Sequence, residues 1–462
     1  MANFRFDLQD FGPKGHDRTV FEVPMIANKN GEVVTTENPF PVTITQAIGY
    51  SNRSTVNDAF GRLRVSNPHT LFDSSLRYGD NTDKWSESET DNSGNSGSAH
   101  NANQGLMDIT LGTSSGDEII RETKRVFSYQ PGKSLLALNT FVMNEGKTNL
   151  RQRVGYFGAE NGVFLELDGT DLYIVKRSKV TGSVVDTKIA QANWNIDTMD
   201  GDADTANPSG YTLSIDKAQI FWSDFEWLGV GSVRVGFVVN GQFIPVHAFH
   251  HANTSDAAYD GLSTYITTAT LPCRFEITNT GATGSASTLK QICSSIMTEG
   301  GYDKVSQEHT ARMTSVKGSI GTTFLPLVSI RLKSTRLDAV VIPSTVNFMG
   351  IAATGTSDYE VVMVKNATLG GSPSWNTSTF DNVEFDLAAS SITIPAGGIV
   401  KAYYATSTNQ AQSTIADTGA YNLDLQIGRT LAGVSDIYTL CCRTLSGTNS
   451  AIGGISFYDL TN

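Results

Sequence analysis

The chain has 462 residues and a formal net charge of −12, from 34 Lys and Arg against 46 Asp and Glu. Such an acidic chain is a poor partner for nucleic acid, because nonspecific binding to phosphates depends on Lys and Arg. Only 17% of the residues are charged, below the roughly 25% of ordinary soluble domains, and 43 are glycine. This composition favours short strands joined by tight turns, and the 39% of hydrophobic residues excludes disorder of the whole chain.

Residues 1–15 contain no apolar core of a secretory signal peptide, and no stretch reaches the roughly 18 apolar residues of a membrane span. We therefore expect neither secretion through such a peptide nor membrane insertion. The four cysteines are too few for a disulfide scaffold, and the adjacent pair suits neither a redox motif nor a zinc knuckle. We expect them to be small buried hydrophobes in strands: Cys273, Cys293, Cys441 and Cys442.

Residues 1–60 predict an extended amino-terminal arm. Four prolines fall among short apolar runs there, so this segment cannot bury a core of its own. We expect the arm to pack against the body of the chain or against a neighbouring subunit, as an anchor. The prolines are Pro13, Pro24, Pro39 and Pro41.

From residue 61 the apolar residues alternate with a period of two, as they do in half-buried β-strands. Asp168-Gly169 and Asn240-Gly241 separate apolar runs and predict hairpin turns. The polar stretch 85–104 predicts an exposed loop, and 289–297 fits either a strand or a short helix. Strands are predicted at 108–111, 119–127, 135–142, 152–157, 163–167, 172–175, 211–215, 220–227, 233–239, 243–246, 265–271 and 274–277. Together they indicate a jelly-roll-like β-sandwich over 61–300.

The pattern lapses at 300–313, which we interpret as a linker, and then resumes. Strands are predicted at 329–332, 338–342, 346–349, 359–364, 383–387, 392–394, 399–404, 423–427, 438–443 and 455–458. They indicate a second β-sandwich over 301–462. The predicted fold class is therefore all-β, with two antiparallel β-sandwich or jelly-roll domains after the arm.

Two short motifs resemble catalytic signatures without their structural context. Residues 112–116 match G-x-S-x-G, but an apparent strand follows where a nucleophile elbow needs a helix, so a Ser/Gly-rich hairpin loop is favoured. Gly132-Lys133-Ser134 resembles the end of a phosphate-binding loop, but Phe127 stands where its first glycine is required. We predict no catalytic residues. Paired glycosidase carboxylates cannot be located from sequence, because their spacing is a property of the fold.

Two clusters of potential metal ligands have simpler interpretations. His247, His250 and His251 follow a predicted strand, whose geometry sends His247 and His250 to opposite faces, which favours a structural role. Asp200, Asp202 and Asp204 begin like an EF-hand loop, but Thr205 and Tyr211 stand where that loop needs glycine and glutamate. A solvated acidic loop is favoured, with an irregular calcium site as the alternative. We predict no metal and no cofactor.

The strand 221–227 alternates between two faces. Phe221, Phe225 and Trp227 share the face expected in the core, and Trp222, Asp224 and Glu226 share the other. An indole ring beside two carboxylates could stack on a sugar and accept its hydroxyl hydrogen bonds, or it could contact a neighbouring subunit. The third interpretation is a partly exposed sheet face without a ligand. Trp222, Asp224 and Glu226 are the candidate ligand-binding residues.

Three segments carry a family resemblance: 57–66 (NDAFGRLRVS) continuing through 68–73 (PHTLFD), then 155–157 (GYF) before 161–164 (NGVF), then 227–236 (WLGVGSVRVG). In this order they resemble a family of virion structural proteins of tailed phages, often marine or cyanobacterial, over about residues 40–300. The resemblance implies a particle component of β-rich appendages or surface layers, with no catalytic residues to carry over. The residues after about 300 resemble no family that we can name.

These observations lead to a functional hypothesis with two alternatives. The first is a non-enzymatic virion protein of the tail, neck or capsid surface, assembled in the host cytoplasm and anchored by residues 1–60. Its expected partners are other virion proteins and two further copies of itself, since exchange of arms within a homotrimer would offset the entropy of ordering them. The alternatives are a receptor-binding tail fibre or spike that recognises host glycans, and a polysaccharide hydrolase.

Overall fold

The computed structural model describes residues 3–5, 22–24, 58, 68–202, 205–254, 261–303, 306–408, 414–416 and 423–461. The chain forms two compact units, Met1–Ser51 and Asn52–Asn462. In the first unit, β1 (Asn3–Arg5) pairs antiparallel with β2 (Glu22–Pro24). Apart from these strands and Asp58, the predicted arm lies outside the described residues.

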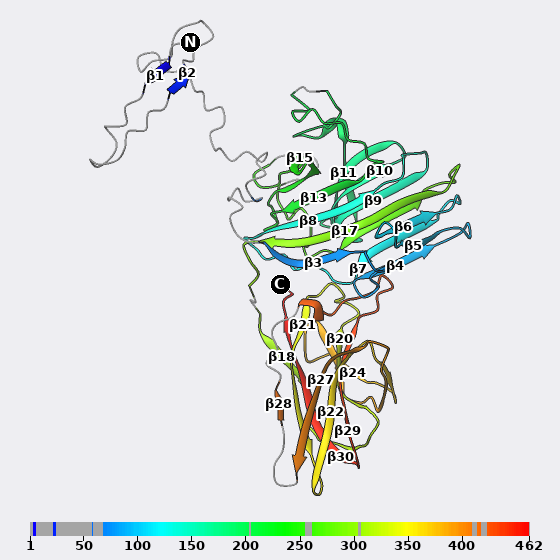
Figure 1. Ribbon diagram of the computed structural model, residues 1–462, viewed down its shortest axis with the longest axis vertical. Coiled ribbons are helices and arrows are strands. Elements are labelled where there is room, and N and C mark those ends of the chain that lie inside the picture. Colours follow the sequence, from blue (N-terminus) through cyan, green and yellow to red (C-terminus); the bar gives the residue numbers. More distant parts are fainter. Residues whose placement is uncertain are drawn as a thin grey trace. The chain divides into compact units, whose positions relative to one another are not determined.

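The strands between residues 69 and 299 of the second unit form two antiparallel sheets (Figure 1). The seven-stranded sheet has the order β12-β11-β10-β9-β16-β7-β4. Its strands are β4 (Trp85–Thr90), β7 (Glu118–Thr123), β9 (Leu150–Phe157), β10 (Gly162–Asp168), β11 (Asp171–Ser178), β12 (Val185–Ala190) and β16 (Cys273–Asn279).

The facing eight-stranded sheet has the order β15-β14-β13-β8-β17-β6-β5, and β3 pairs with β17 beside that path. Its strands are β3 (His69–Ser75), β5 (Gly97–Asn101), β6 (Leu106–Leu111), β8 (Ser134–Val142), β13 (Gln219–Phe225), β14 (Val233–Val239), β15 (Gln242–Phe249) and β17 (Ser287–Glu299). Because β17 is one continuous strand of 13 residues, its segment 289–297 is a strand and not a helix.

The strands after residue 307 form a second sandwich. One sheet has the order β18-β30-β21-β28, with β19 on β30, and the other has the order β24-β25-β20-β29-β22-β27. A two-stranded sheet of β23 and β26 completes it. The strands are β18 (Glu308–Arg312), β19 (Lys317–Ile320), β20 (Leu325–Leu332), β21 (Val341–Ile351), β22 (Thr356–Lys365), β23 (Thr368–Gly370), β24 (Trp375–Asn376), β25 (Val383–Asp386), β26 (Ser391–Thr393), β27 (Ile399–Thr408), β28 (Thr414–Ala416), β29 (Ile437–Thr444) and β30 (Asn449–Asp459).

The described chain is therefore all-β with antiparallel sandwiches, which confirms the predicted fold class. Its only described helices are two 3-10 turns, η2 (Gln191–Asn193) and η3 (Leu423–Leu425). None of the described helices is long and apolar enough to cross a membrane.

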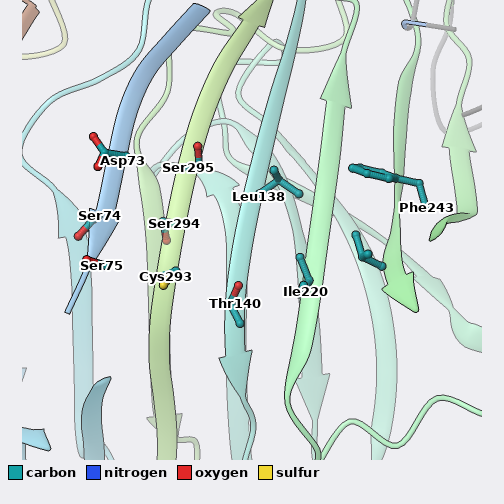
Figure 2. Close-up of a pocket in the computed structure, with 11 residues that line it drawn as sticks. Asp73, Ser74, Ser75, Leu138, Thr140, Ile220, Phe243, Cys293, Ser294 and Ser295 are labelled. Carbon is teal, nitrogen blue, oxygen red and sulfur yellow. The ribbon is translucent and has the colours of Figure 1, made fainter. Parts of the chain in front are cut away.

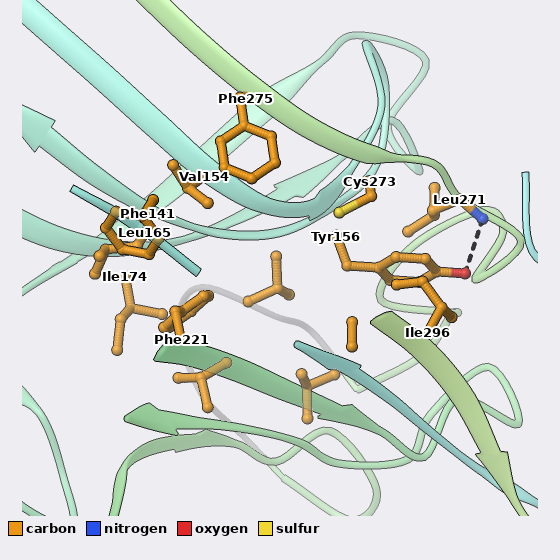
Figure 3. Close-up of a cluster of buried hydrophobic side chains, with 14 of the residues drawn as sticks. Phe141, Val154, Tyr156, Leu165, Ile174, Phe221, Leu271, Cys273, Phe275 and Ile296 are labelled. Atoms are coloured by element: carbon orange, nitrogen blue, oxygen red, sulfur yellow. Dashed lines mark hydrogen bonds between the residues drawn. The ribbon is translucent and has the colours of Figure 1, made fainter. Parts of the chain in front are cut away.

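The core of the first sandwich lies between its two sheets and is rich in aromatic side chains (Figure 3). Tyr156 of β9 is fully buried there, and its hydroxyl accepts a hydrogen bond from the backbone N–H of Leu271 over 3.1 Å. The same hydroxyl lies 2.9 Å from the carbonyl oxygen of Ala269. Burial raises the pKa of this phenol, which stays a neutral donor at any ordinary pH. One side chain thus fixes a loop to the sheet.

Both predicted hairpins form. Asn240 and Gly241 make the turn between β14 and β15, and both have positive φ, 51° and 76°, which these two residue types tolerate best. The β10–β11 turn lies one residue later than the dipeptide suggests. Asp168 is still paired in β10, so the turn residues are Gly169 and Thr170.

The prediction of an exposed loop at 85–104 is wrong, because the stretch contains β4 and β5. These two strands sit at the edges of different sheets, β4 beside β7 and β5 beside β6. An edge strand has little apolar surface to bury, and polar side chains there discourage pairing with other chains. Because these strands are polar, the search for alternating apolar residues did not identify them.

Three predicted strands are absent. Residues 211–215 make only an isolated bridge, between Asp200 and Thr212, and 423–427 begins with η3. Residues 265–271 form a buried loop, with the side chains of Tyr265 and Ile266 inside the core. Conversely, the predicted linker 300–313 contains β18, and the two strands predicted at 338–349 are one strand, β21. In the absent strands, the apolar residues of the sequence indicated that a segment is buried but did not indicate that its backbone is extended.

The segment 423–431 contacts the first sandwich near the end of β7. The side chain of Gln426 donates to the carbonyl oxygen of Val126 over 2.8 Å, and the backbone N–H of Arg429 donates to the carbonyl oxygen of Lys124 over 2.8 Å. The Arg429 guanidinium also lies 2.6 Å from the carboxylate of Glu122. These side-chain and backbone contacts join the two sandwiches within the second unit.

Candidate functional site

An open groove of about 490 Å³ lies on the outer face of the eight-stranded sheet, away from the core (Figure 2). The sheet register explains its shape. On one row of cross-strand neighbours, Cys293 of β17 lies between Ser75 of β3 and Thr140 of β8, and Ile220 of β13 follows beside Thr140. Phe243 of β15 lines the far end, and Figure 2 shows its ring pointing from β15 toward the middle of the sheet.

The next row supplies the rest of the floor. Ser295 of β17 lies between Asp73 and Leu138, and Leu138 in turn faces Trp222 of β13. The groove therefore has two chemical halves. Its β3–β17 end carries a carboxylate, hydroxyls and a thiol, and its β13–β15 end is aliphatic and aromatic, with Val238 beside Phe243.

Cys293 corrects the expectation that all four cysteines are buried, because it alone is exposed. The register of β17 against β8 shifts between Gln291 and Cys293, which is the mark of a β-bulge. A bulge re-aims the side chains that follow it, and here it turns the thiol out of the core and into the groove. A second register shift, between Ile296 and Met297, lies at the pairing with β3.

Trp222 lies on the predicted face, but it is only 2% exposed. Its indole N–H donates to the carbonyl oxygen of Phe237 over 3.2 Å, and its ring packs against Phe243 at 5.6 Å between centroids. Gly236 makes room for the indole, since a Cβ there would come within 2.7 Å of the ring and 2.0 Å of the Ile244 carbonyl oxygen. Trp222 therefore packs against Phe243, a residue of the aromatic end of the groove, but does not itself line the groove.

Asp224 and Glu226 continue along the same face. Asp224 is fully buried, is ion paired with Arg234 and accepts a hydrogen bond from the Ser134 hydroxyl. Glu226 is partly buried, which raises the pKa of its carboxyl, and it accepts a hydrogen bond from the backbone N–H of Ser232. The three candidate ligand-binding residues therefore share one face but not one open cavity, and their role in binding stays a prediction.

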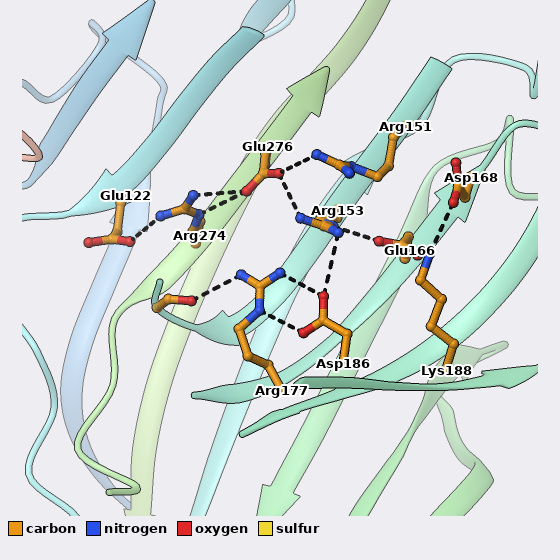
Figure 4. A network of polar contacts seen from close by, with 11 residues as sticks. Glu122, Arg151, Arg153, Glu166, Asp168, Arg177, Asp186, Lys188, Arg274 and Glu276 are labelled. Atoms are coloured by element: carbon orange, nitrogen blue, oxygen red, sulfur yellow. Dashed lines mark hydrogen bonds and ion pairs between the residues drawn. The ribbon is translucent and has the colours of Figure 1, made fainter. Parts of the chain in front are cut away.

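A row of charged side chains crosses the outer face of the seven-stranded sheet (Figure 4). Arg153 of β9 reaches Glu166 of β10 at 2.6 Å and Glu276 of β16 at 2.9 Å. Arg274 joins Glu276 to Glu122 of β7, at 2.9 and 3.0 Å. These five side chains, which we call the ionic row, are almost completely buried. The alternation of charged and apolar residues in β9 and β16 is the sequence signal that could have identified them.

Two aromatic rings and a further arginine support the ionic row. Phe157 and Phe164 stack at 4.2 Å between centroids, and the Arg177 guanidinium lies over both rings. Arg177 also makes a bidentate pair with Asp186 of β12, with both bonds at 2.8 Å.

The ionic row keeps the Glu276 carboxylate charged. Burial by itself would raise the pKa of Glu276, but the nearby Arg274 and Arg153 outweigh it, and the pKa is lowered. A carboxyl group that stays ionised at neutral pH cannot act as the proton donor of a glycosidase. The row is therefore suited to fixing the sheet and not to acid catalysis.

The predicted histidine cluster divides between separate partners. The Nδ1 atom of His250 lies 3.0 Å from the Ser232 hydroxyl, whereas His251 lies 3.1 Å from the Lys176 ammonium and stacks on Tyr265 at 3.7 Å. His247 accepts a hydrogen bond from the backbone N–H of Asn195. Among the described residues, no group of three or more His, Cys, Asp or Glu could hold a metal ion.

The predicted acidic loop is held by its own hydrogen bonds. Asp200 accepts bonds from the backbone N–H of Asp202, the Thr198 hydroxyl and the Asn207 amide, which lower the pKa of its carboxyl. Asp204 lies outside the described residues.

The two enzyme-like motifs lie in turns. The G-x-S-x-G segment 112–116 connects β6 to β7, so a strand follows it, as expected. The Gly132-Lys133-Ser134 segment leads into β8, and the Lys133 ammonium is bonded to Asp303 at 2.8 Å.

No protein-family model matches the chain, and no curated protein matches it either. Solved structures with a similar arrangement of strands include the carbohydrate recognition domain of Emp47p, at 10% identity over 50% of this chain and 96% of that chain, with a TM-score of 0.30. A family 16 glycoside hydrolase of Bacteroides ovatus matches at 9% identity over 49% and 99%, with a TM-score of 0.31. A protein of unknown function from Shewanella oneidensis matches at 11% over 50% and 88%, with a TM-score of 0.31. At these identities and TM-scores the likeness carries nothing about function.

Proposed function

We propose that this protein is a non-enzymatic structural component of a tailed-phage virion, in the tail, the neck or the capsid surface. The observation that carries the proposal is the set of three sequence segments that resemble such proteins. Two of these segments lie in strands of the first sandwich or next to them: 155–157 and 161–164 lie in or beside β9 and β10, and 227–236 leads into β14. Gly236, for example, is needed for close packing against Trp222. The described motif residues thus maintain the fold of the sandwich. This is what we expect of a structural protein, which acts through the contacts of its surface and not through catalytic residues.

The electrostatics support a non-catalytic role. The carboxylates that the seven-stranded sheet brings together are matched by arginines in the ionic row. The carboxyls of Glu118 and Glu226 have pKa values raised by burial and by neighbouring carboxylates, Glu276 for Glu118 and Asp58 and Asp224 for Glu226, but neither glutamate is among the residues that line the groove. A hydrolase would need such a group beside a second carboxylate on the wall of one cleft.

The test is incorporation into particles. The anchor hypothesis assigns attachment to the arm, so a chain lacking residues 1–50 should fold and yet be absent from purified virions. The matched control is the full-length chain carrying Tyr404→Ala, which changes a 71% exposed side chain of β27 and should be incorporated normally. Normal incorporation of the truncated chain would refute the anchor.

Recognition of host glycans is the second candidate function, and the groove is the observation that favours it. The open groove has a volume of about 490 Å³, which is within the roughly 300–1,000 Å³ of small-molecule sites. A glycan array probed with the full-length chain tests this function directly. If no glycan on the array binds, this candidate is rejected and the structural role is unaffected.

A further inference from the structure

We propose that the groove on the eight-stranded sheet binds a neutral oligosaccharide, with the sugar rings lying across β17, β8 and β13 between Asp73 and Phe243. This inference rests on the second candidate function above and gives it a site and a ligand class. Nothing in it depends on Asp224 or Glu226.

The distribution of polar and apolar atoms is the first argument. A pyranose ring presents C–H groups on its faces and hydroxyls around its edge. Leu138, Ile220 and Phe243 supply apolar surface for a ring face, and Ile220 is 37% exposed within it. The hydroxyls of Thr140 and Ser295 and the Asp73 carboxylate supply acceptors and donors for the ring edge. The two halves of the groove match the two parts of the ligand.

Charge selects neutral sugars over acidic ones. Among the described residues that line the groove, Asp73 is the one carboxylate, and none is a lysine or an arginine. The Lys84 ammonium lies 3.8 Å from the Asp73 carboxylate, so it balances that charge without presenting an anion site. The chain as a whole carries −12, which repels a polyanion further.

Backbone pairing argues against a peptide ligand. Peptides that bind to sheets add a strand to a free edge, where unpaired N–H and C=O groups are available. Here β17 is paired with β3 and β8, β8 with β17 and β13, and β13 with β8 and β14. The floor over these three strands therefore offers side chains alone. The strand edges that have one partner only, those of β3 and β15, lie at the two ends of the groove, where an added strand would extend the sheet and not cross the floor. A lipid tail fits no better, because it would remove water from the hydroxyl half without replacing its hydrogen bonds.

Two register shifts flank the polar end of the groove. The bulge in β17 before Cys293 turns its thiol into the groove, and the shift after Ile296 has its extra residue, Leu71, in β3. Bulges occur preferentially where a strand must re-aim a side chain beside a binding site. Cys293 also reports on occupancy, because the other three cysteines are buried and only this thiol is open to a reagent.

The experiment measures binding and thiol protection on the full-length chain. The probes are cellotetraose, laminaritetraose and maltotetraose, with the anionic tetragalacturonate as the comparison. Titration calorimetry gives each Kd. Alkylation of Cys293 by N-ethylmaleimide is then timed with and without the tightest probe at ten times its Kd, at pH 8.5 because burial raises the pKa of this thiol. Competition should slow alkylation about 11-fold, following 1 + [L]/Kd.

Three variants localise the bound sugar. Phe243→Ala should weaken binding at least tenfold, and Asp73→Asn and the exposed-site Ile220→Asp should each weaken it several-fold. The last two change exposed side chains, so they keep the test valid if Phe243→Ala unfolds the chain. Tyr404→Ala on the second sandwich is the matched control and should bind as the wild type does.

Each outcome is decisive. Binding of a neutral tetrasaccharide with protection of Cys293 supports the proposal. Binding that leaves the alkylation rate and the groove variants unchanged overturns this site but keeps glycan recognition. Tighter binding of tetragalacturonate overturns the ligand class. Absence of binding by all three neutral probes overturns the proposal, while incorporation into particles separately tests the structural role.

Discussion

The Nδ1 atom of His247 accepts a hydrogen bond from the backbone N–H of Asn195 over 3.2 Å. That bond requires a neutral imidazole with its proton on Nε2. Burial, with smaller contributions from His250 and Lys176, lowers the pKa of His247 to about 4. The ring therefore links a loop to β15 only while it is uncharged.

Stability should depend on pH through this residue. The folded pKa lies below the unfolded value of about 6.5, so the stabilisation is complete above pH 6.5 and is lost as the pH falls toward 4. The expected loss between pH 7.5 and pH 4.5 is about 2.5 kcal/mol. Urea unfolding at pH 7.5 and pH 4.5 measures it, and His247→Gln should flatten the difference. His309→Gln, in the second sandwich, is the matched control; equal pH dependence of both variants and the wild type would contradict the assignment.

Gly236→Ala should destabilise the first sandwich. A Cβ at this position would lie 2.0 Å from the Ile244 carbonyl oxygen and 2.7 Å from the Trp222 ring. The carbonyl oxygen belongs to the backbone of a paired strand, so moving it away would cost free energy. Overpacking of this kind costs about 1–3 kcal/mol and sometimes more. Gly284→Ala is the control, since nothing lies within 4 Å of its Cβ. Thermal unfolding followed by tryptophan fluorescence compares the two, and an unchanged transition for Gly236→Ala would show that the close packing is not required.

Breaking the ionic row should cost far more than breaking a surface pair. Arg153→Met leaves the buried carboxylates of Glu166 and Glu276 with fewer partners, and the loss of one member of a buried pair typically costs about 3–5 kcal/mol. Lys179→Met breaks an exposed pair with Glu160 and should cost less than about 1 kcal/mol. Denaturant midpoints of both variants test the contrast. Similar midpoints would mean that the row is replaceable by apolar packing.

The purified full-length chain should be a homotrimer. Ordering an arm of about 60 residues costs roughly 1–2 kcal/mol per residue, and contacts with neighbouring copies are one way to offset it. Light scattering on the full-length chain should give three copies, and deletion of residues 1–50 should reduce it to one. A stable dimer would make the trimer wrong, and a full-length monomer would mean that the partners are supplied by the particle.

Local patterns predicted the interior of the sandwiches well. The pattern of apolar residues located β8, β9, β14 and β29 nearly to the residue, because these strands are central in their sheets and mostly buried. The edge strands β4 and β5 escaped detection because they bury too little to need apolar residues. Residues 265–271 were wrongly predicted to be a strand, because a loop whose side chains enter the core is as apolar as a strand.

The groove could not be predicted for a different reason. Its polar end joins β3 to β17, whose facing residues Ser75 and Cys293 are more than 200 positions apart in the chain. Register decides which residues become neighbours, and one bulge in β17 decides that a thiol faces outward. Alternation did assign Trp222 to the face that carries the groove, but burial of its ring against Phe243 depends on Gly236 in the adjacent strand.

The bulge that exposes Cys293 also gives the protein a natural attachment point for a marker. With the other three cysteines buried, a maleimide-linked gold cluster should couple at one atom of each unmodified chain. If the protein is a virion component, as proposed, electron micrographs of labelled particles would show where each copy lies and how many copies surround each symmetry axis. Because of this one register shift, the protein can be labelled at a single site, and located, without any substitution in its sequence.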